Sequence, residues 1–150
     1  MKIVKTKDPN SIKFINDKVQ DLIEKEGITE YNKNLFIKWL RQSMSNPFVG
    51  FWIAVEEKEE SVDFNVLGFI VASIQSNLMK EYINISQILG SEEVEKALLE
   101  KVDNWAKENG IDEIMTTSRH PNRWKNYGFE VDYHILSKKE SKVQQEVKEE

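Results

Sequence analysis

The sequence predicts one domain of the α/β (α+β) class, with helices on both faces of a mixed, mostly antiparallel sheet of six strands. Three observations support this. Two helical segments precede three consecutive strand-like segments. Residues 82–117 then run as strand, helix and strand, the pattern of a crossover between parallel strands. A short helix and a last strand follow, so the predicted order is β-α-α-β-β-β-α-β-α-β.

The first 47 residues are predicted to form a strand and two helices. Residues 1–7 alternate between apolar and lysine positions, and Asp8-Pro9 supplies a cap followed by proline at the start of a helix. Gly27 ends this helix. A shorter helix precedes Asn46-Pro47. The apolar stripe of the first helix consists of Ile12, Ile15, Val19, Leu22 and Ile23.

The middle of the chain predicts a hairpin, a third strand and a central helix. Residues 48–55 and 66–74 are apolar runs joined by an acidic segment, and residues 81–88 form the next strand. The helix after it ends at Asn109-Gly110, and residues 111–117 resume strand character. Its apolar face consists of Val94, Ala97, Leu98, Val102, Trp105 and Ala106.

The C-terminal part predicts a helix of at most two turns in residues 121–127 and a last strand in residues 131–136. Residues 139–150 are almost wholly charged and polar. We therefore expect a single domain at residues 1–138, followed by a disordered tail or frayed helix.

Composition excludes several classes of function. The 150 residues include no cysteine, which excludes disulfides, zinc thiolate sites and a cysteine nucleophile. A net charge of -5 argues against nucleic acid or an anionic membrane as the main partner. The longest apolar run, residues 66–74, is far shorter than the roughly 20 residues that span a bilayer. We expect a soluble, intracellular protein of the cytoplasm.

Two segments carry a family resemblance. Residues 97–111 read ALLEKVDNWAKENGI, and residues 127–130 read YGFE. Together with the order of elements, they resemble the central helix and the closing motif of the GNAT superfamily, the acyl-coenzyme A dependent N-acetyltransferases. The segment around residues 119–124 looks more like acetyltransferase-like proteins of bacteriophages. A phage member would lie in the host cytoplasm or the virion.

The resemblance implies acetyl-CoA as cofactor. In the family, pantetheine lies where the fourth and fifth strands splay apart, which here means residues 81–88 and 111–118. The backbone near Ser86 and Ile88 would orient the carbonyl. The pyrophosphate loop would start at Gly90 and Ser91. Trp124 stands where many members have a tyrosine that protonates the leaving thiolate, so we place it at the cofactor site as well.

The presumed phosphate loop departs from the family pattern. Its positions hold one glycine, no basic residue and three glutamates: Glu92, Glu93 and Glu95. These carboxylates would repel a phosphate. They would also suit the first turn of a helix capped by Ser91, because acids there complement the helix dipole. Two interpretations stay open: a helix end that satisfies itself, and a loop that still accepts a phosphate.

Three residues are candidates for catalysis. Glu81 could act as a general base through water, His120 lies at a corner where a base could face the acyl group, and Tyr127 carries a hydroxyl near the short helix. The alternatives are a solvent-facing glutamate and an ordinary surface or capping histidine. No cluster has metal-ligand spacing.

Three hypotheses follow. The first is an N-acetyltransferase that acts on an amine of a small molecule or a protein. The second is an inactive GNAT-fold module, such as a phage protein, that binds a protein partner or forms a homodimer. The third is an unrelated α/β domain in which the fourth and fifth strands stay paired along their whole length.

Overall fold

The computed structural model describes residues 1–28, 30–57, 64–118, 121–132 and 136–138. The chain forms two compact units, Met1–Thr116 and Thr117–Glu150. The first unit contains the sheet and the three long helices, and the second contains one short helix. The single domain expected at residues 1–138 remains a prediction, and residues 139–150 lie outside the described residues.

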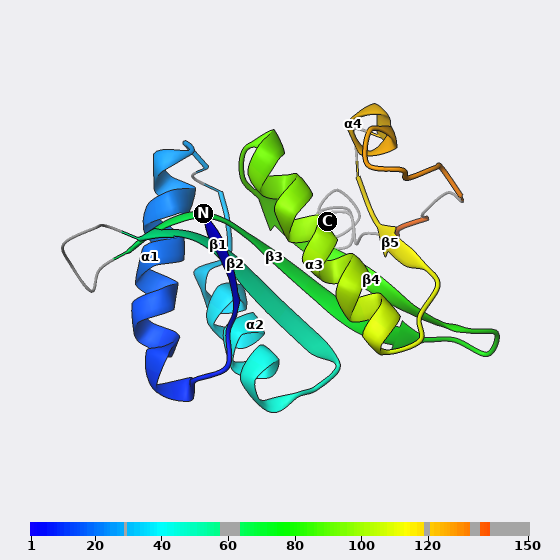
Figure 1. Ribbon diagram of the computed structural model, residues 1–150, viewed down its shortest axis with the longest axis horizontal. Coiled ribbons are helices and arrows are strands. Elements are labelled where there is room, and N and C mark those ends of the chain that lie inside the picture. Colours follow the sequence, from blue (N-terminus) through cyan, green and yellow to red (C-terminus); the bar gives the residue numbers. More distant parts are fainter. Residues whose placement is uncertain (29, 58–63, 119–120, 133–135, 139–150) are drawn as a thin grey trace, which may run out of the picture. The chain divides into compact units, whose positions relative to one another are not determined.

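The first unit is built on one sheet with the strand order β1-β2-β3-β4-β5 (Figure 1). Neighbouring strands from β1 to β4 are antiparallel, and β5 runs parallel to β4. The strands span Lys2–Lys5, Val49–Glu57, Phe64–Ser76, Glu81–Leu89 and Ile114–Thr116. The predicted class is thus confirmed: the sheet is mixed and mostly antiparallel.

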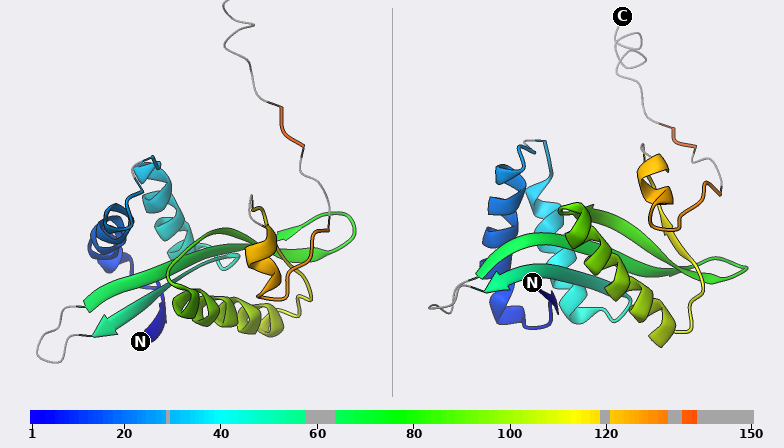
Figure 2. Two further views of the ribbon diagram at one scale, coloured as in Figure 1. Left: turned by 90° about the horizontal axis from the view of Figure 1, so that it is seen from above. Right: turned by 45° about the horizontal axis from the view of Figure 1, so that its top comes forward.

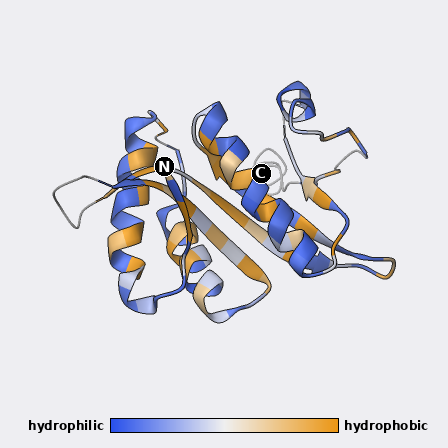
Figure 3. Cartoon of the chain, viewed as in Figure 1, coloured by the Kyte–Doolittle hydropathy of each residue, from blue (hydrophilic) through white to orange (hydrophobic). Residues whose placement is uncertain are grey.

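Helices lie on both faces of this sheet, as predicted (Figure 2). The 3-10 turn η1 (Pro9–Ser11) leads into α1 (Ile12–Lys25), and α1 and α2 (Lys33–Ser45) cover one face. There Phe36 of α2 meets Phe69 of β3 with ring centroids 5.2 Å apart. On the other face lies α3 (Glu92–Glu108), where Trp105 meets Trp52 of β2 at 5.2 Å. Figure 3 shows hydrophilic and hydrophobic residues interspersed along these helices.

Helix boundaries follow the predicted capping chemistry. The Asp8 side chain accepts a hydrogen bond from the N–H of Asn10 at 3.0 Å, just ahead of α1. At the end of α3, Gly110 has a φ of +66° and its N–H donates to the Lys107 carbonyl at 3.2 Å. Ile111 N–H donates to the Ala106 carbonyl at 2.8 Å. This pair of bonds is the Schellman closure, which favours glycine.

Two expectations about strands need correction. Strand character was expected from Ile111, but β5 begins only at Ile114 because the Ile111 N–H closes α3 and its side chain is buried. The expected sheet has six strands, whereas the described residues form five. The sixth was placed at residues 131–136, of which 133–135 lie outside the described residues and the others are not in a strand.

The second unit contains α4 (Pro121–Lys125) and a small aromatic cluster. The ring of Trp124 meets those of Tyr127 and Phe129 at centroid distances of 6.1 and 5.1 Å. Gly128 has a φ of +86°, and its N–H donates to the Lys125 carbonyl. The glycine exit predicted after the short helix is therefore present.

One lysine lies against the aromatic pair of the α3 face. The Lys5 ammonium is 5.2 Å from the Trp52 ring centroid and 5.1 Å from that of Trp105. Burial lowers the pKa of Lys5 below its ordinary value of 10.5, with Lys7 acting in the same direction and Glu108 opposing it. The folded state therefore releases this proton more readily than the unfolded state does.

The free energy of unfolding should rise less with pH in Lys5→Met than in the wild type. Because the folded pKa is lowered, the contribution of Lys5 to the free energy of unfolding rises with pH in the interval below 10.5. The change in Tm between pH 7 and pH 10, measured by differential scanning calorimetry, should be more positive for the wild type than for the variant. Equal changes in Tm for the wild type and the variant would show that the pKa of Lys5 is not lowered in the folded state.

Candidate functional site

The parallel ladder between β4 and β5 is short. It joins Ile83 to Ile114, Asn84 to Met115 and Ile85 to Thr116, where the Thr116 hydroxyl donates to the Ile85 carbonyl at 3.2 Å. β5 ends there, whereas β4 continues to Leu89 (Figure 1). In the described part of the chain, the last three residues of β4 therefore pair on the β3 side alone. This is the place where the sequence predicts the cofactor wedge.

A β-bulge lies where the parallel ladder stops. In the antiparallel pairing, Val71 faces Gln87 and Ala72 faces Ile85, so Ser86 has no opposite residue on β3. Ser86 is exposed. A bulge frees backbone N–H and C=O groups from the ladder and is common beside binding sites. An extended ligand with its own amide groups could pair with this edge of β4 as an added strand does.

The turn from β4 into α3 lies directly beyond this edge. Ser91 caps the helix: its side chain accepts a bond from the Val94 N–H at 3.4 Å, and its carbonyl accepts the Glu95 N–H at 2.8 Å. The first N–H groups of a helix have no partner within it. The N–H groups of Glu92 and Glu93 are thus the donors that the first turn can direct at an anion.

The side chains of this turn are acidic and differ in burial. Glu92 and Glu93 are exposed, and the Glu92 carboxylate lies 3.6 Å from the Lys96 ammonium. Glu95 is buried, with an exposed fraction of 2%. The carboxylates of Glu92 and Glu93 therefore belong to the same two residues whose N–H groups are the donors. Ser91 caps the helix, as the first interpretation expects, and a loop that accepts a phosphate stays a prediction.

Two glycines let α3 approach the sheet at this turn. A Cβ on Gly68 would lie 2.4 Å from the Leu89 carbonyl oxygen and 2.5 Å from Val94 Cγ1. A Cβ on Gly90, whose φ is +155°, would lie 2.6 Å from Val94 Cγ1. Gly90 is thus needed for packing as well as for the turn. The sequence analysis missed Gly68, although a glycine within a β-branched run is the signal of a close backbone approach.

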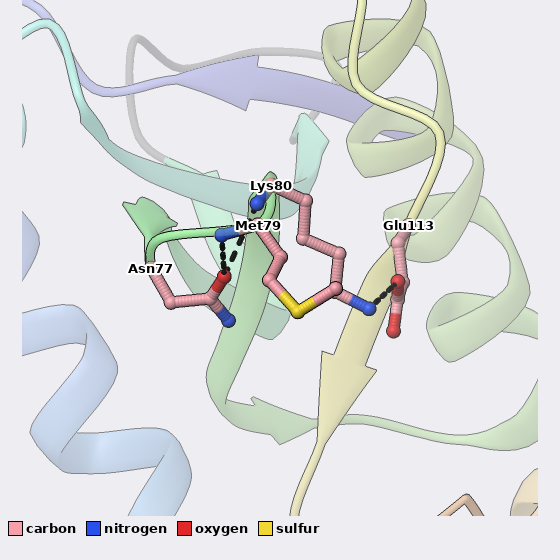
Figure 4. Close-up of polar contacts among 4 residues, drawn as sticks. All are labelled: Asn77, Met79, Lys80 and Glu113. Atoms are coloured by element: carbon pink, nitrogen blue, oxygen red, sulfur yellow. Dashed lines mark hydrogen bonds and ion pairs between the residues drawn. The ribbon is translucent and has the colours of Figure 1, made fainter.

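The opposite end of β4 is anchored by the β3–β4 turn (Figure 4). The Asn77 side chain accepts bonds from the N–H groups of Met79 and Lys80 at 2.8 and 3.1 Å. The Lys80 ammonium forms an ion pair with Glu113, just ahead of β5. This contact ties the turn to the segment that leads into β5, where the parallel ladder begins.

The other predicted site residues belong to β4 and to the second unit, or lie outside the described residues. Glu81 is the first residue of β4 and is exposed, about 16 Å along the strand from Ser86 at the usual rise per residue. Ile88 lies on the stretch of β4 that pairs with β3 alone, opposite Ile70. Tyr127 and Trp124 belong to the second unit, and His120 lies outside the described residues.

Other kinds of site find no support in the described residues. They contain no group of three His, Asp or Glu side chains that could hold a metal ion. None of the helices described is both long and apolar enough to cross a membrane.

Comparison with known proteins identifies the fold. No family model matches the sequence, and no curated protein matches it. Among solved structures, a "predicted acetyltransferase" from Clostridium acetobutylicum with acetyl-CoA superposes with a TM-score of 0.69 at 16% identity, covering 92% of this chain and 95% of that one. The aminoglycoside N-acetyltransferase AAC(6')-Iy in complex with CoA gives 0.70 at 14% identity, with 93% of each chain covered.

A third similar structure is an aminoglycoside acetyltransferase from an uncultured soil metagenomic sample, in complex with sisomicin. It gives a TM-score of 0.61 at 12% identity and covers 93% of this chain and 95% of that chain. At such low identity these likenesses establish the fold. The chain has the GNAT fold of the acetyltransferases, as the sequence resemblance implied, and so shares more with them than the order of its elements.

Proposed function

We propose that this protein is an N-acetyltransferase that uses acetyl-CoA to acetylate an amine. The observation that carries the proposal is the parallel ladder that stops at Ile85, beside a bulge at Ser86 and ahead of a helix N-terminus. Similar structures of the same fold were solved with acetyl-CoA or CoA.

The residues present fit most of this cofactor. The backbone of residues 86–89 can pair with the amide groups of the pantetheine arm. Gly90 and Ser91 form the turn at which the N–H groups of Glu92 and Glu93 can donate to the pyrophosphate. The carboxylates of the same two residues oppose it, so we expect weaker phosphate binding than a glycine-rich loop would give.

Chemistry at the acyl group would use the nearby backbone and two proton carriers. When bound, acetyl-CoA supplies a thioester that an amine can attack without a covalent enzyme intermediate. The backbone of Ser86 and Ile88 would orient the carbonyl. We propose Tyr127 as the acid for the leaving thiolate, Glu81 or His120 as the acceptor of the amine proton, and Trp124 as a wall of the cofactor site.

A second candidate is a GNAT-fold module that binds a partner without catalysis. The acidic side chains in the first turn of α3 favour it, because they disfavour a bound pyrophosphate.

A thermal-shift titration with acetyl-CoA separates the two candidates. A ligand at 100 times its Kd adds about 2.7 kcal/mol to the free energy of unfolding, so the N-acetyltransferase should show a clear rise in Tm. Acetyl-pantetheine, which lacks the nucleotide, serves as the control for the pantetheine arm. No rise at millimolar acetyl-CoA would refute the N-acetyltransferase and leave the binding module.

A further inference from the structure

The parallel ladder between β4 and β5 begins and ends with different kinds of hydrogen bond. At its start, the N–H of Ile83 donates to the backbone carbonyl of Glu113 at 2.9 Å. At its end, the backbone carbonyl of Ile85 accepts the side-chain hydroxyl of Thr116 at 3.2 Å. Thr116 is half-buried and is the last residue of β5. A side chain therefore makes the contact with which the described ladder ends.

This contact satisfies a carbonyl without extending the strand. Backbone carbonyls need hydrogen-bond donors, and a longer parallel strand would supply them as a series of N–H groups. The hydroxyl of a threonine supplies one donor only. The Thr116 side chain thus closes the ladder at Ile85, and the residues of β4 that follow have no partner on β5 in the described part of the chain.

The closed part of the ladder is tightly packed on one face. Ile83 and Ile85 point to the same face of β4, and their exposed fractions are 0% and 3%. Side chains this buried are packed about as densely as molecules in an organic crystal. A ligand group that entered between the strands at this point would have to move them.

The proposed cofactor would meet this closed end with its acyl group. In the proposed function, the pyrophosphate lies at the turn into α3 and the pantetheine arm follows β4 back from residue 89 to residue 86. The thioester then lies near Ser86. The acyl chain beyond it points at Ile85 and Thr116, the residue pair that ends the ladder.

We infer that Thr116 is a specificity-determining residue, which limits the acyl group to two carbons and disfavours a four-carbon group. This inference rests on the proposed N-acetyltransferase function. A four-carbon chain would have to open the pair of Ile85 and Thr116, which lengthens the available space by about 3.3 Å, the rise of one strand residue. The Ile85 carbonyl would lose its donor and the packed isoleucine would move. Together these costs exceed the gain from burying two more methylene groups.

The test compares the Kd values of acetyl-CoA, butyryl-CoA and CoA, measured by isothermal titration calorimetry. The wild type should bind acetyl-CoA about tenfold more tightly than butyryl-CoA. Thr116→Val keeps the shape of the side chain but removes the hydroxyl, so this ratio should fall to about two. Thr116→Ser keeps the hydroxyl and should keep the ratio of the wild type. The Kd of CoA, which has no acyl group, should be the same in all three proteins.

Thr6→Val is the matched control for the loss of a threonine hydroxyl bound to a strand carbonyl. Thr6 follows β1, at the opposite edge of the sheet, and its hydroxyl donates to the Phe51 carbonyl at 3.1 Å. Thr6→Val should lower Tm, because it leaves the Phe51 carbonyl without this donor, but it should leave the ratio of the two Kd values unchanged.

Several results would overturn this inference alone. They are equal affinity of the wild type for acetyl-CoA and butyryl-CoA, an unchanged ratio in Thr116→Val, and a ratio that falls as far in Thr116→Ser or Thr6→Val. The comparison within the wild type decides the matter even where a variant does not fold. If neither CoA nor the two thioesters bind the wild type, the proposed function is overturned and this inference with it.

Discussion

Replacing Gly68 with alanine is expected to lower the free energy of unfolding by about 3 kcal/mol, at the upper end of the usual cost of overpacking. The added methyl group would meet the Leu89 carbonyl oxygen at 2.4 Å and Val94 Cγ1 at 2.5 Å. The carbonyl belongs to the backbone of β4 and cannot rotate aside. The start of α3 must therefore shift, and the affinity for acetyl-CoA should fall with it. Urea denaturation and calorimetry measure the two effects.

Gly110→Ala is the control for the loss of a glycine as such. Gly110 has a φ of +66°, and nothing lies within 4 Å of a Cβ added there. Only backbone strain should result, about 1 kcal/mol. A cost for Gly68→Ala no greater than that for Gly110→Ala would show that the contact between α3 and β3 is looser than the structure implies.

Replacing Glu92 and Glu93 together with glutamine should raise the affinity for acetyl-CoA about tenfold and lower Tm. One carboxylate about 5 Å from a phosphate repels it by roughly 3 kcal/mol at an effective dielectric of 20, and water and salt reduce this greatly for exposed groups. Stability should fall because both acids complement the dipole of α3. Glu95 is left in place because it is buried. Calorimetry at low and high salt checks the effect, which should shrink at high salt.

Glu100→Gln removes one carboxylate from the same helix, which is half the charge change of the double variant. Glu100 is exposed and about 12 Å further along α3 than Glu92, beyond the Debye length of about 8 Å at physiological salt. It should leave the affinity unchanged. A gain from Glu100→Gln of half the double variant's gain in binding free energy would mean that only net charge matters. An unchanged affinity in the double variant would mean that the phosphates bind elsewhere.

The elements of the first unit could be predicted because their signals are local. Helical spacing, the Asp8-Pro9 start and the Asn109-Gly110 end each depend on neighbouring residues, and all three are confirmed. The pairing of β4 with β5 also followed from the order of elements, because a crossover connection joins parallel strands.

Features that depend on pairing between residues far apart in the chain could not be predicted from the sequence. The bulge at Ser86 comes from the register between β3 and β4, which no local pattern encodes. Ile111 fits a strand by composition, but its N–H is needed to close α3. The hydrogen bonds between Tyr82, Gln75 and Ser73 exist only because the hairpin brings these residues face to face.

The two tryptophans that meet on the α3 face give the protein an intrinsic spectroscopic probe. The indoles of Trp52 and Trp105 are 5.2 Å apart and nearly perpendicular, at 71°, and they belong to different elements. Chromophores this close couple their electronic transitions, so a distinct near-ultraviolet circular dichroism signal should exist only while α3 is seated on β2. Spectroscopy without any label can therefore follow whether the helix that begins at the cofactor turn is held in place.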